Sequence, residues 1–132
     1  MENIPLLIID DNKSHLMLET RALAEGHYDI RTAQHADEAW AVLQNFLPKL
    51  ILMDIQLPGV NGLELASKLK NDPRYRDIPI IAITAYGMKG DREMVLAAGC
   101  NDYISKPIDI ETFPRLIAEA LKKSVSGGPL TQ

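Results

Sequence analysis

Five polar residues of types that could act together follow apolar segments of the 132-residue chain. They are Asp10, Asp11, Asp54, Thr84 and Lys106. Carboxylates that lie close together repel one another unless a cation is present, and their oxygens suit a hard ion such as Mg²⁺. A hydroxyl and an ammonium can both donate hydrogen bonds to the oxygens of an anion. If the fold brings the five side chains together, the set predicts a site for a divalent cation and an anionic group.

Each of these residues also has an ordinary structural explanation. Asp10 and Asp11, followed by Asn12, could simply begin a helix, because short polar side chains cap helix N-termini. Asp54 alone could be a turn residue, and Lys106 alone could be a solvated surface lysine. Turn formation explains the set less well, because compatible chemistry follows four separate apolar segments.

The elements that must position these residues are five short segments that read as strands. Three of them are apolar without two-residue alternation, which is typical of strands buried on both faces of a parallel sheet. The second segment is half polar, which predicts an edge strand. The five expected strands are Ile4–Ile9, Tyr28–Ala33, Leu50–Met53, Ile78–Thr84 and Asp102–Ser105.

Helical patterns lie between and after these strands. Apolar residues recur there at the spacing of one helix face, and Gly26, Gly99 and Asp72-Pro73 stand where helices end. The expected helices are 13–25, Ala36–Leu47, 61–71, 88–98 and Phe113–Leu121. Strict alternation predicts an α/β fold, with a doubly wound parallel sheet and helices on both faces. In such sheets ligands bind beyond the carboxyl ends of the strands, where all five polar residues stand.

Composition excludes several classes of protein. There are 14 Lys and Arg residues against 18 Asp and Glu residues, a net charge of −4, which argues against broad nucleic-acid binding. One cysteine, Cys100, cannot form an intrachain disulfide or a Cys-rich zinc site. No apolar run approaches the roughly 20 residues that cross a bilayer, and the first residues lack the basic region of a signal peptide. We expect a cytoplasmic protein without a membrane partner.

The motifs together resemble the receiver domain of bacterial two-component response regulators. The resemblance rests on Asp10-Asp11, on Asp54 within MDIQLPGVNG, on Thr84-Ala85 and on Lys106-Pro107, and it covers about residues 4–123. It implies a flavodoxin-like sheet with strand order 2-1-3-4-5. We expect a receiver domain over residues 1–123 and a flexible tail over 124–132, where the sequence is rich in Ser, Gly and Pro.

The resemblance also implies a role for each polar residue. Asp54 would accept a phosphoryl group from a histidine kinase or a histidine phosphotransfer protein, in a reaction that the chain itself catalyses although it is no conventional enzyme. Asp11, Asp54 and the main-chain carbonyl of Gln56 would bind Mg²⁺ (or Mn²⁺), and Asp10 would act through a metal-bound water. Lys106 and Thr84 would contact the phosphoryl oxygens. Gly59 and Gly62 would permit a tight turn after Asp54.

The same resemblance implies a conformational switch and a lifetime for the phosphorylated form of the chain. Thr84 would move toward the phosphoryl group, and Tyr103 would rotate inward into the vacated space. This would alter the face formed by the fourth helix, fifth strand and fifth helix, where a downstream protein would bind. Gln56 and Tyr86 would flank the path of hydrolytic water, and since neither is a carboxylate, we expect self-dephosphorylation to be slow to moderate.

Four alternatives remain to be weighed. A phosphoaspartate hydrolase needs a second acid two residues after its nucleophile, where this chain has Gln56. A flavin or dinucleotide binder would carry a Gly-rich loop after the first strand, where this chain has two acids. A histidine phosphotransfer module would be a helical bundle, which the alternation of strands and helices contradicts. We expect structural or surface roles for His15, His27 and His35. Within the receiver family, a free-standing regulator and a domain excised from a hybrid kinase or multidomain regulator both stay open.

Overall fold

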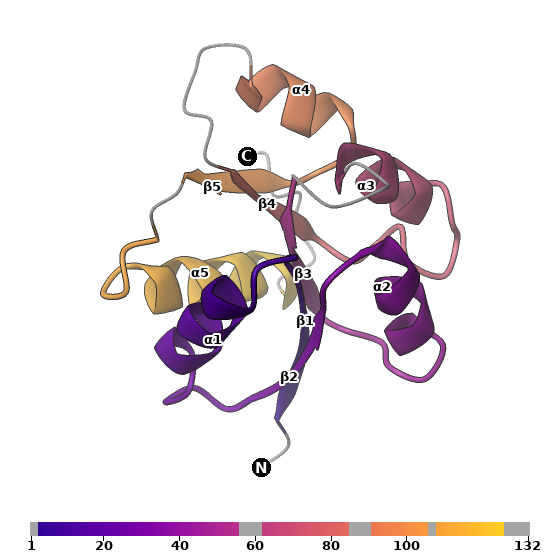
Figure 1. Cartoon of the computed structure of the whole chain (residues 1–132). Helices are drawn as coiled ribbons and strands as arrows, with labels where there is room; N and C mark the ends of the chain where they lie inside the picture. Colours follow the sequence, from indigo (N-terminus) through magenta and orange to yellow (C-terminus); the bar gives the residue numbers. More distant parts are fainter. Residues whose placement is uncertain (1–2, 56–61, 85–90, 106–107, 126–132) are drawn as a thin grey trace.

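The computed structural model describes residues 3–55, 62–84, 91–105 and 108–125 (Figure 1). Strands and helices alternate along the chain, as the apolar segments predict. The elements are β1 (Ile4–Ile9), α1 (Lys13–Ala22), β2 (Tyr28–Ala33), α2 (Ala36–Leu43), β3 (Leu50–Asp54), α3 (Gly62–Lys70), β4 (Ile80–Thr84), α4 (Asp91–Ala97), β5 (Asp102–Ser105) and α5 (Phe113–Val125). The predicted tail, 124–132, lies mostly outside these residues.

The strands form one parallel sheet in the order β2-β1-β3-β4-β5, which confirms the predicted flavodoxin-like topology. β2 lies at an edge, as its half-polar sequence predicts. Every residue of β3 and β4 is buried, because helices cover both faces of the sheet and leave these strands no contact with water. The register aligns Ile9 with Met53 on the neighbouring strand, so β1 and β3 reach the same edge of the sheet.

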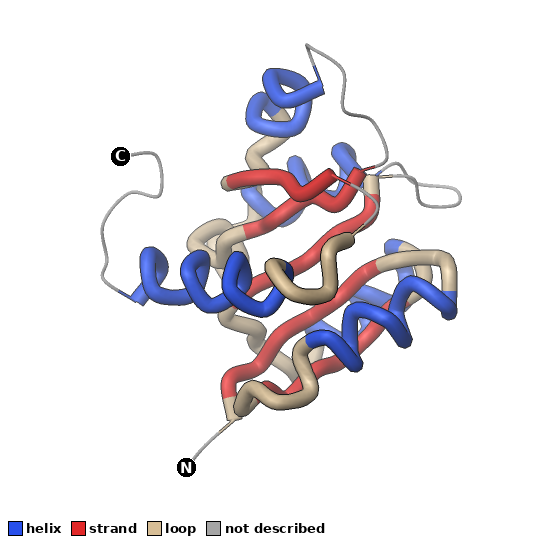
Figure 2. The backbone as a smooth tube through the Cα atoms, turned by 90° about the vertical axis from the view of Figure 1, so that its left-hand side faces the viewer, coloured by secondary structure: helices blue, strands red, loops and turns tan. Residues whose placement is uncertain are grey.

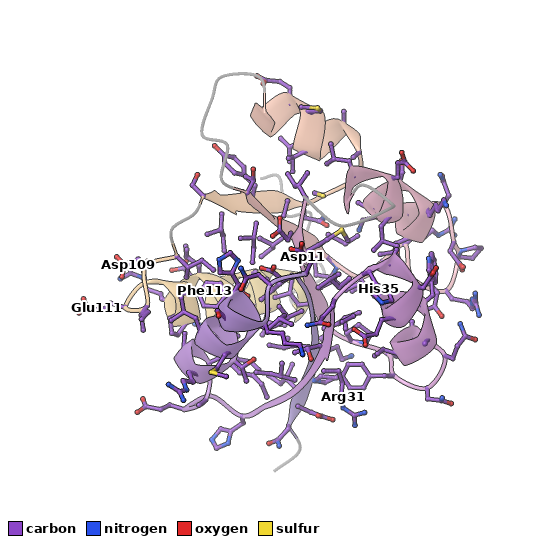
Figure 3. All side chains as sticks on the ribbon, viewed as in Figure 1. Asp11, Arg31, His35, Asp109, Glu111 and Phe113 are labelled. Carbon is purple, nitrogen blue, oxygen red and sulfur yellow. The ribbon has the colours of Figure 1, made fainter. Side chains whose placement is uncertain are left out.

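Each face of the sheet has its own hydrophobic core. One core packs α2, α3 and α4 against residues such as Ile9, Met53 and Ala82. The other packs α1 and α5 against the alternate strand residues, such as Ile8 and Leu52. Figure 2 views the sheet from the side covered by α1 and α5. Phe113, the first residue of α5, is fully buried and belongs to this second core together with Leu16 of α1; it is labelled in Figure 3.

Several expected boundaries differ from the structure, and two of these differences have clear local reasons. α2 ends at Leu43 rather than Leu47, since the main-chain N–H groups of Gln44 and Asn45 close tight turns and Pro48 disfavours a helical Leu47. Leu47 is 63% exposed instead of facing the core. β4 begins at Ile80, because the N–H of Ile78 closes a turn onto the carbonyl of Tyr75 at 3.0 Å.

The predicted end of α4 at Gly99 is confirmed. Gly99 has φ 109°, which favours glycine. Its N–H donates to the Leu96 carbonyl (3.0 Å), and the N–H of Cys100 donates to the Val95 carbonyl (3.2 Å), the paired bonds of a Schellman motif. Within the described part of the chain, no helix combines the length and apolar character that a bilayer crossing requires.

Candidate functional site

Two carboxylates are buried at the carboxyl ends of neighbouring strands. Asp10 directly follows β1 and is 1% exposed, and Asp54 ends β3 and is 4% exposed. The alignment of Ile9 with Met53 brings the residues that follow them side by side. Burying two carboxylates together costs several kcal/mol unless positive charge or hydrogen-bond donors compensate. The arrangement therefore suits a bound cation.

Main-chain hydrogen bonds fix the orientation of Asp10. Its N–H donates to the carbonyl of Ala33 on β2 at 2.9 Å. Its Oδ1 accepts the N–H of Asn12 at 2.9 Å. The other oxygen, Oδ2, lies 3.4 Å from Nδ1 of His15. One carboxylate oxygen is thus held by the backbone, and the second lies beside the imidazole.

His15 joins the two carboxylates because of the way α1 begins. Asn12 caps the helix, and its side-chain oxygen accepts the N–H groups of Ser14 (2.8 Å) and His15 (3.1 Å). Ligand atoms of Asp10, His15 and Asp54 all lie within 4.8 Å of one another. The His15 side chain is 43% exposed, so one side of this pocket opens to solvent. The expected structural or surface role of His15 did not include this position beside the two carboxylates.

The other predicted site residues lie at different depths. Asp11 is exposed at the sheet edge (Figure 3) and is not among the described groups within that 4.8 Å limit. Thr84 ends β4 and is 1% exposed. Tyr103 is half-buried on β5. Three further predicted residues lie outside the described residues: Gln56, Tyr86 and Lys106.

Gly62 begins α3 directly against the backbone that follows β3. Its N–H donates to the Ile55 carbonyl at 2.8 Å. A Cβ at Gly62 would lie 2.6 Å from the Asp54 carbonyl oxygen and 2.8 Å from the Ile55 Cα. The absence of a side chain therefore lets the start of the helix reach the Asp54 backbone. Gly59 lies outside the described residues.

Comparison with known proteins decides the family. Residues 6–118 match the family described as the response regulator receiver domain. The chain belongs to this family. It is 40% identical over 116 residues to the polar-differentiation response regulator DivK of Brucella anthropi, an alignment that covers 88% of this chain and 94% of DivK. It is therefore a two-component receiver domain of nearly the same extent as DivK.

Solved structures of receiver domains have the same fold. The CheY-like receiver domain protein of Methanospirillum hungatei JF-1 is 28% identical with a TM-score of 0.86, covering 96% of this chain and all of that one. The response regulator Rcp1, in its Mn²⁺-bound form, superposes with a TM-score of 0.73 at 21% identity, covering 91% of this chain and 92% of that one. The grouping of Asp10, His15 and Asp54 is consistent with the metal site of a receiver domain.

The receiver domain also buries an acid that the sequence analysis missed. Glu19 lies on α1, one turn after His15, and is fully buried. It shares a helix face with Leu16 and Leu23, which pack into the core beside α5. The spacing i, i+3 and i+7 would have predicted this burial, since it places the three residues on one stripe of the helix.

Proposed function

We propose that Asp54 is the phosphoacceptor of this receiver domain. An oxygen of its carboxylate attacks the phosphorus of a phosphohistidine on a histidine kinase or a histidine phosphotransfer protein. The bond between phosphorus and the imidazole nitrogen breaks, and an aspartyl phosphate forms on Asp54. The observation that carries the proposal is the burial of Asp54 beside Asp10 at the carboxyl edge of a parallel sheet. Family membership supports a cytoplasmic setting for this exchange.

The residues around Asp54 fit a divalent cation. Asp10 and Asp54 offer buried carboxylate oxygens, and Asp11 directly follows Asp10 in the chain and is exposed. In the proposal Asp11, Asp54 and the Gln56 carbonyl would hold Mg²⁺ or Mn²⁺, and Asp10 would act through a metal-bound water. The bound ion supplies charge neutralisation, which lets an anionic phosphoryl group approach three carboxylates. The formal charge of these carboxylates with Lys106 is −2, equal and opposite to that of one divalent ion.

Thr84 and Lys106 complete the proposed site. The Thr84 hydroxyl donates to one phosphoryl oxygen, and the Lys106 ammonium pairs with another. Catalysis in this scheme is positioning plus charge neutralisation, which is what phosphoryl transfer mainly requires. Gln56 and Tyr86 flank the path of hydrolytic water, and we expect an aspartyl phosphate that lasts minutes or longer. A half-life of a few seconds would contradict this part of the proposal.

The proposed switch connects Thr84 with Tyr103. Thr84 pairs with Ser105, and Ala82 pairs with Tyr103, so all four lie on the same face of the sheet. Phosphorylation adds about one negative charge and three acceptor oxygens. Thr84 moves toward these oxygens, and the half-buried Tyr103 turns into the space that this opens.

The switch would be read by a downstream protein on the face formed by α4, β5 and α5. A groove of about 280 Å³ lies at the β5 and α5 part of this face, lined by residues that include Tyr103, Ser105, Leu116 and Ala120. Because Tyr103 is one of the residues that line this groove, its rotation would change the shape of the groove. A Tyr103→Ala variant should still be phosphorylated but should lose the phosphorylation-dependent change in hydrogen exchange along α5. An unaltered change would argue against the switch.

Intact mass tests the phosphoacceptor. The chain is incubated with acetyl phosphate and Mg²⁺, and we expect a gain of one phosphoryl group that is lost in Asp54→Asn and without the metal. Asp29→Asn is the matched control, because Asp29 is also a strand aspartate but lies half-exposed on β2 in an ion pair with Arg31. No adduct on the wild-type chain, or an adduct that persists in Asp54→Asn, would refute the proposal.

A further inference from the structure

The acidic pocket contains a nitrogen donor in addition to its carboxylates. His15 contributes an imidazole within 4.8 Å of the ligand atoms of Asp10 and Asp54. Ligands of a first-row divalent ion, bound at about 2.0–2.2 Å, lie about 3–4 Å from one another. The 3.4 Å between His15 Nδ1 and Asp10 Oδ2 falls in this range. Small side-chain adjustments would therefore allow His15 to bind the same ion as Asp54, whether Asp10 reaches that ion directly or through one of its waters.

The nature of the donor determines which ions gain from it. Mg²⁺ prefers oxygen ligands and keeps several waters, whereas imidazole suits Ni²⁺, Co²⁺ and Zn²⁺. Affinity for a site that contains nitrogen rises along the first row from Mn²⁺ to Ni²⁺. An oxygen-only pocket and a pocket with His15 thus differ most for ions late in the row, and least for Mg²⁺.

The start of α1 makes His15 a defined part of the pocket. The Asn12 cap holds its main-chain N–H at 3.1 Å, which fixes where the side chain leaves the helix. His35 provides a contrast within the same chain. Its Nδ1 accepts the N–H of Glu38 at 3.2 Å and caps α2, so that nitrogen is used by the backbone.

We propose that His15 is a nitrogen ligand of the pocket and biases this receiver domain toward borderline transition ions over Mg²⁺. This rests on the proposed function, in which Asp54 and its neighbouring carboxylates hold a divalent cation. His15 determines which ion is preferred, while the carboxylates determine that a cation binds at all.

Calorimetric titration separates the role of His15 from the role of the carboxylates. Mg²⁺ and Ni²⁺ are titrated at about pH 8, where imidazole is neutral, into the wild-type chain, His15→Asn, His35→Asn and Asp54→Ala. We expect His15→Asn to weaken Ni²⁺ binding by about tenfold or more and to change Mg²⁺ binding by less than about threefold. His35→Asn should change neither affinity, because asparagine is itself a good cap and His35 lies outside the pocket.

A spectroscopic measurement identifies the ligand directly. With Mn²⁺ bound, electron spin-echo modulation should contain a nitrogen coupling that is absent in His15→Asn and unchanged in His35→Asn. Equal weakening of Mg²⁺ and Ni²⁺ in His15→Asn, without a nitrogen coupling in the wild-type chain, would overturn the inference and leave His15 as a charge partner of Asp10.

Failure of the proposed function would look different. If neither ion binds the wild-type chain, or if Asp54→Ala binds both as tightly as the wild type does, the carboxylate pocket is not the metal site and the inference fails with it. If Asp54→Ala weakens both ions while His15→Asn changes neither, the metal site stands and only the role of His15 is refuted.

Discussion

Replacement of Gly62 by alanine tests how tightly the chain is built around Asp54. The new Cβ would lie 2.6 Å from the Asp54 carbonyl oxygen, 2.8 Å from the Ile55 Cα and 2.9 Å from the Ile55 carbonyl oxygen. All three atoms belong to the backbone, so no side-chain rotation can relieve the contacts. Either the start of α3 or the residues that end β3 must move.

The size of the effect follows from these distances. An ordinary contact begins at 3.4 Å, so the closest pair must separate by 0.8 Å (3.4 − 2.6). Overpacking of this kind costs about 1–3 kcal/mol, and alanine recovers about 0.5–1 kcal/mol relative to glycine in a helix. We expect Gly62→Ala to lower the free energy of unfolding by about 1–2 kcal/mol. Because misplacement of a reacting group by about 1 Å can cost about a hundredfold in rate, phosphorylation of Asp54 should slow at least about tenfold.

Thermal unfolding followed by circular dichroism, and the rate of adduct formation from acetyl phosphate, measure the two effects. One to two kcal/mol corresponds to a fall of about 3–8 °C in Tm for a domain of this size. Gly26→Ala is the matched control, because the three atoms nearest to its Cβ all belong to the side chain of Tyr28, which can rotate away. If Gly62→Ala keeps the wild-type Tm and the wild-type rate, the backbone at Asp54 is not fixed in the way we argue.

Three further substitutions or reactions test the structure around the site. His35→Ala should lower the free energy of unfolding in urea by about 1 kcal/mol, because the N–H of Glu38 loses its acceptor, whereas His35→Asn should not. Asn101→Ala should cost about 1–3 kcal/mol in the same assay, since the N–H of Ile80 loses its 2.9 Å bond to the Asn101 side chain at the start of β4; an unchanged midpoint would show that the bond is dispensable. Burial raises the pKa of the Cys100 thiol from 9.0 to about 11, so at about pH 8 a disulfide reagent should react about a hundredfold more slowly with the folded chain than with the chain in urea. Equal rates would contradict that burial.

The sequence predicts the position of the carboxylates because one physical rule connects them. Apolar runs without alternation indicate strands buried on both faces, and parallel strands end at one edge. Asp10 and Asp54 stand at the ends of two such runs, so the strand order alone is enough to predict that they lie side by side. The same reasoning places Thr84 at the end of β4, where it is buried.

His15 was not predictable in this way because its position depends on the packing of a helix. Strand alternation directs Asp54 to the same face as Leu52, which is the face covered by α1 and α5. α1 packs on that face through Leu16, so the residue before Leu16 lies near the sheet edge where Asp54 ends. The sequence shows the two-residue period of the strand and the helical period of α1. It does not show how α1 is rotated against the sheet, because that depends on how the side chains of the core under α1 and α5 fit together.

The same alternation divides the site between the two faces of the sheet. Asp54 is directed toward α1 and α5, whereas Thr84 follows Ala82 onto the face where Tyr103 packs. In the functions proposed here, the ligand that selects the metal lies on the first face and the residues of the switch lie on the second. The two are connected through the ends of β3 and β4, where the main-chain N–H of Ile55 donates to the carbonyl of Ile83 at 3.2 Å. The switch residues therefore lie in a different core from α1, whereas α5 shares the core of α1 and also forms part of the proposed docking face. A change at His15 would reach that face through α5, because the switch residues pack on the opposite side of the sheet.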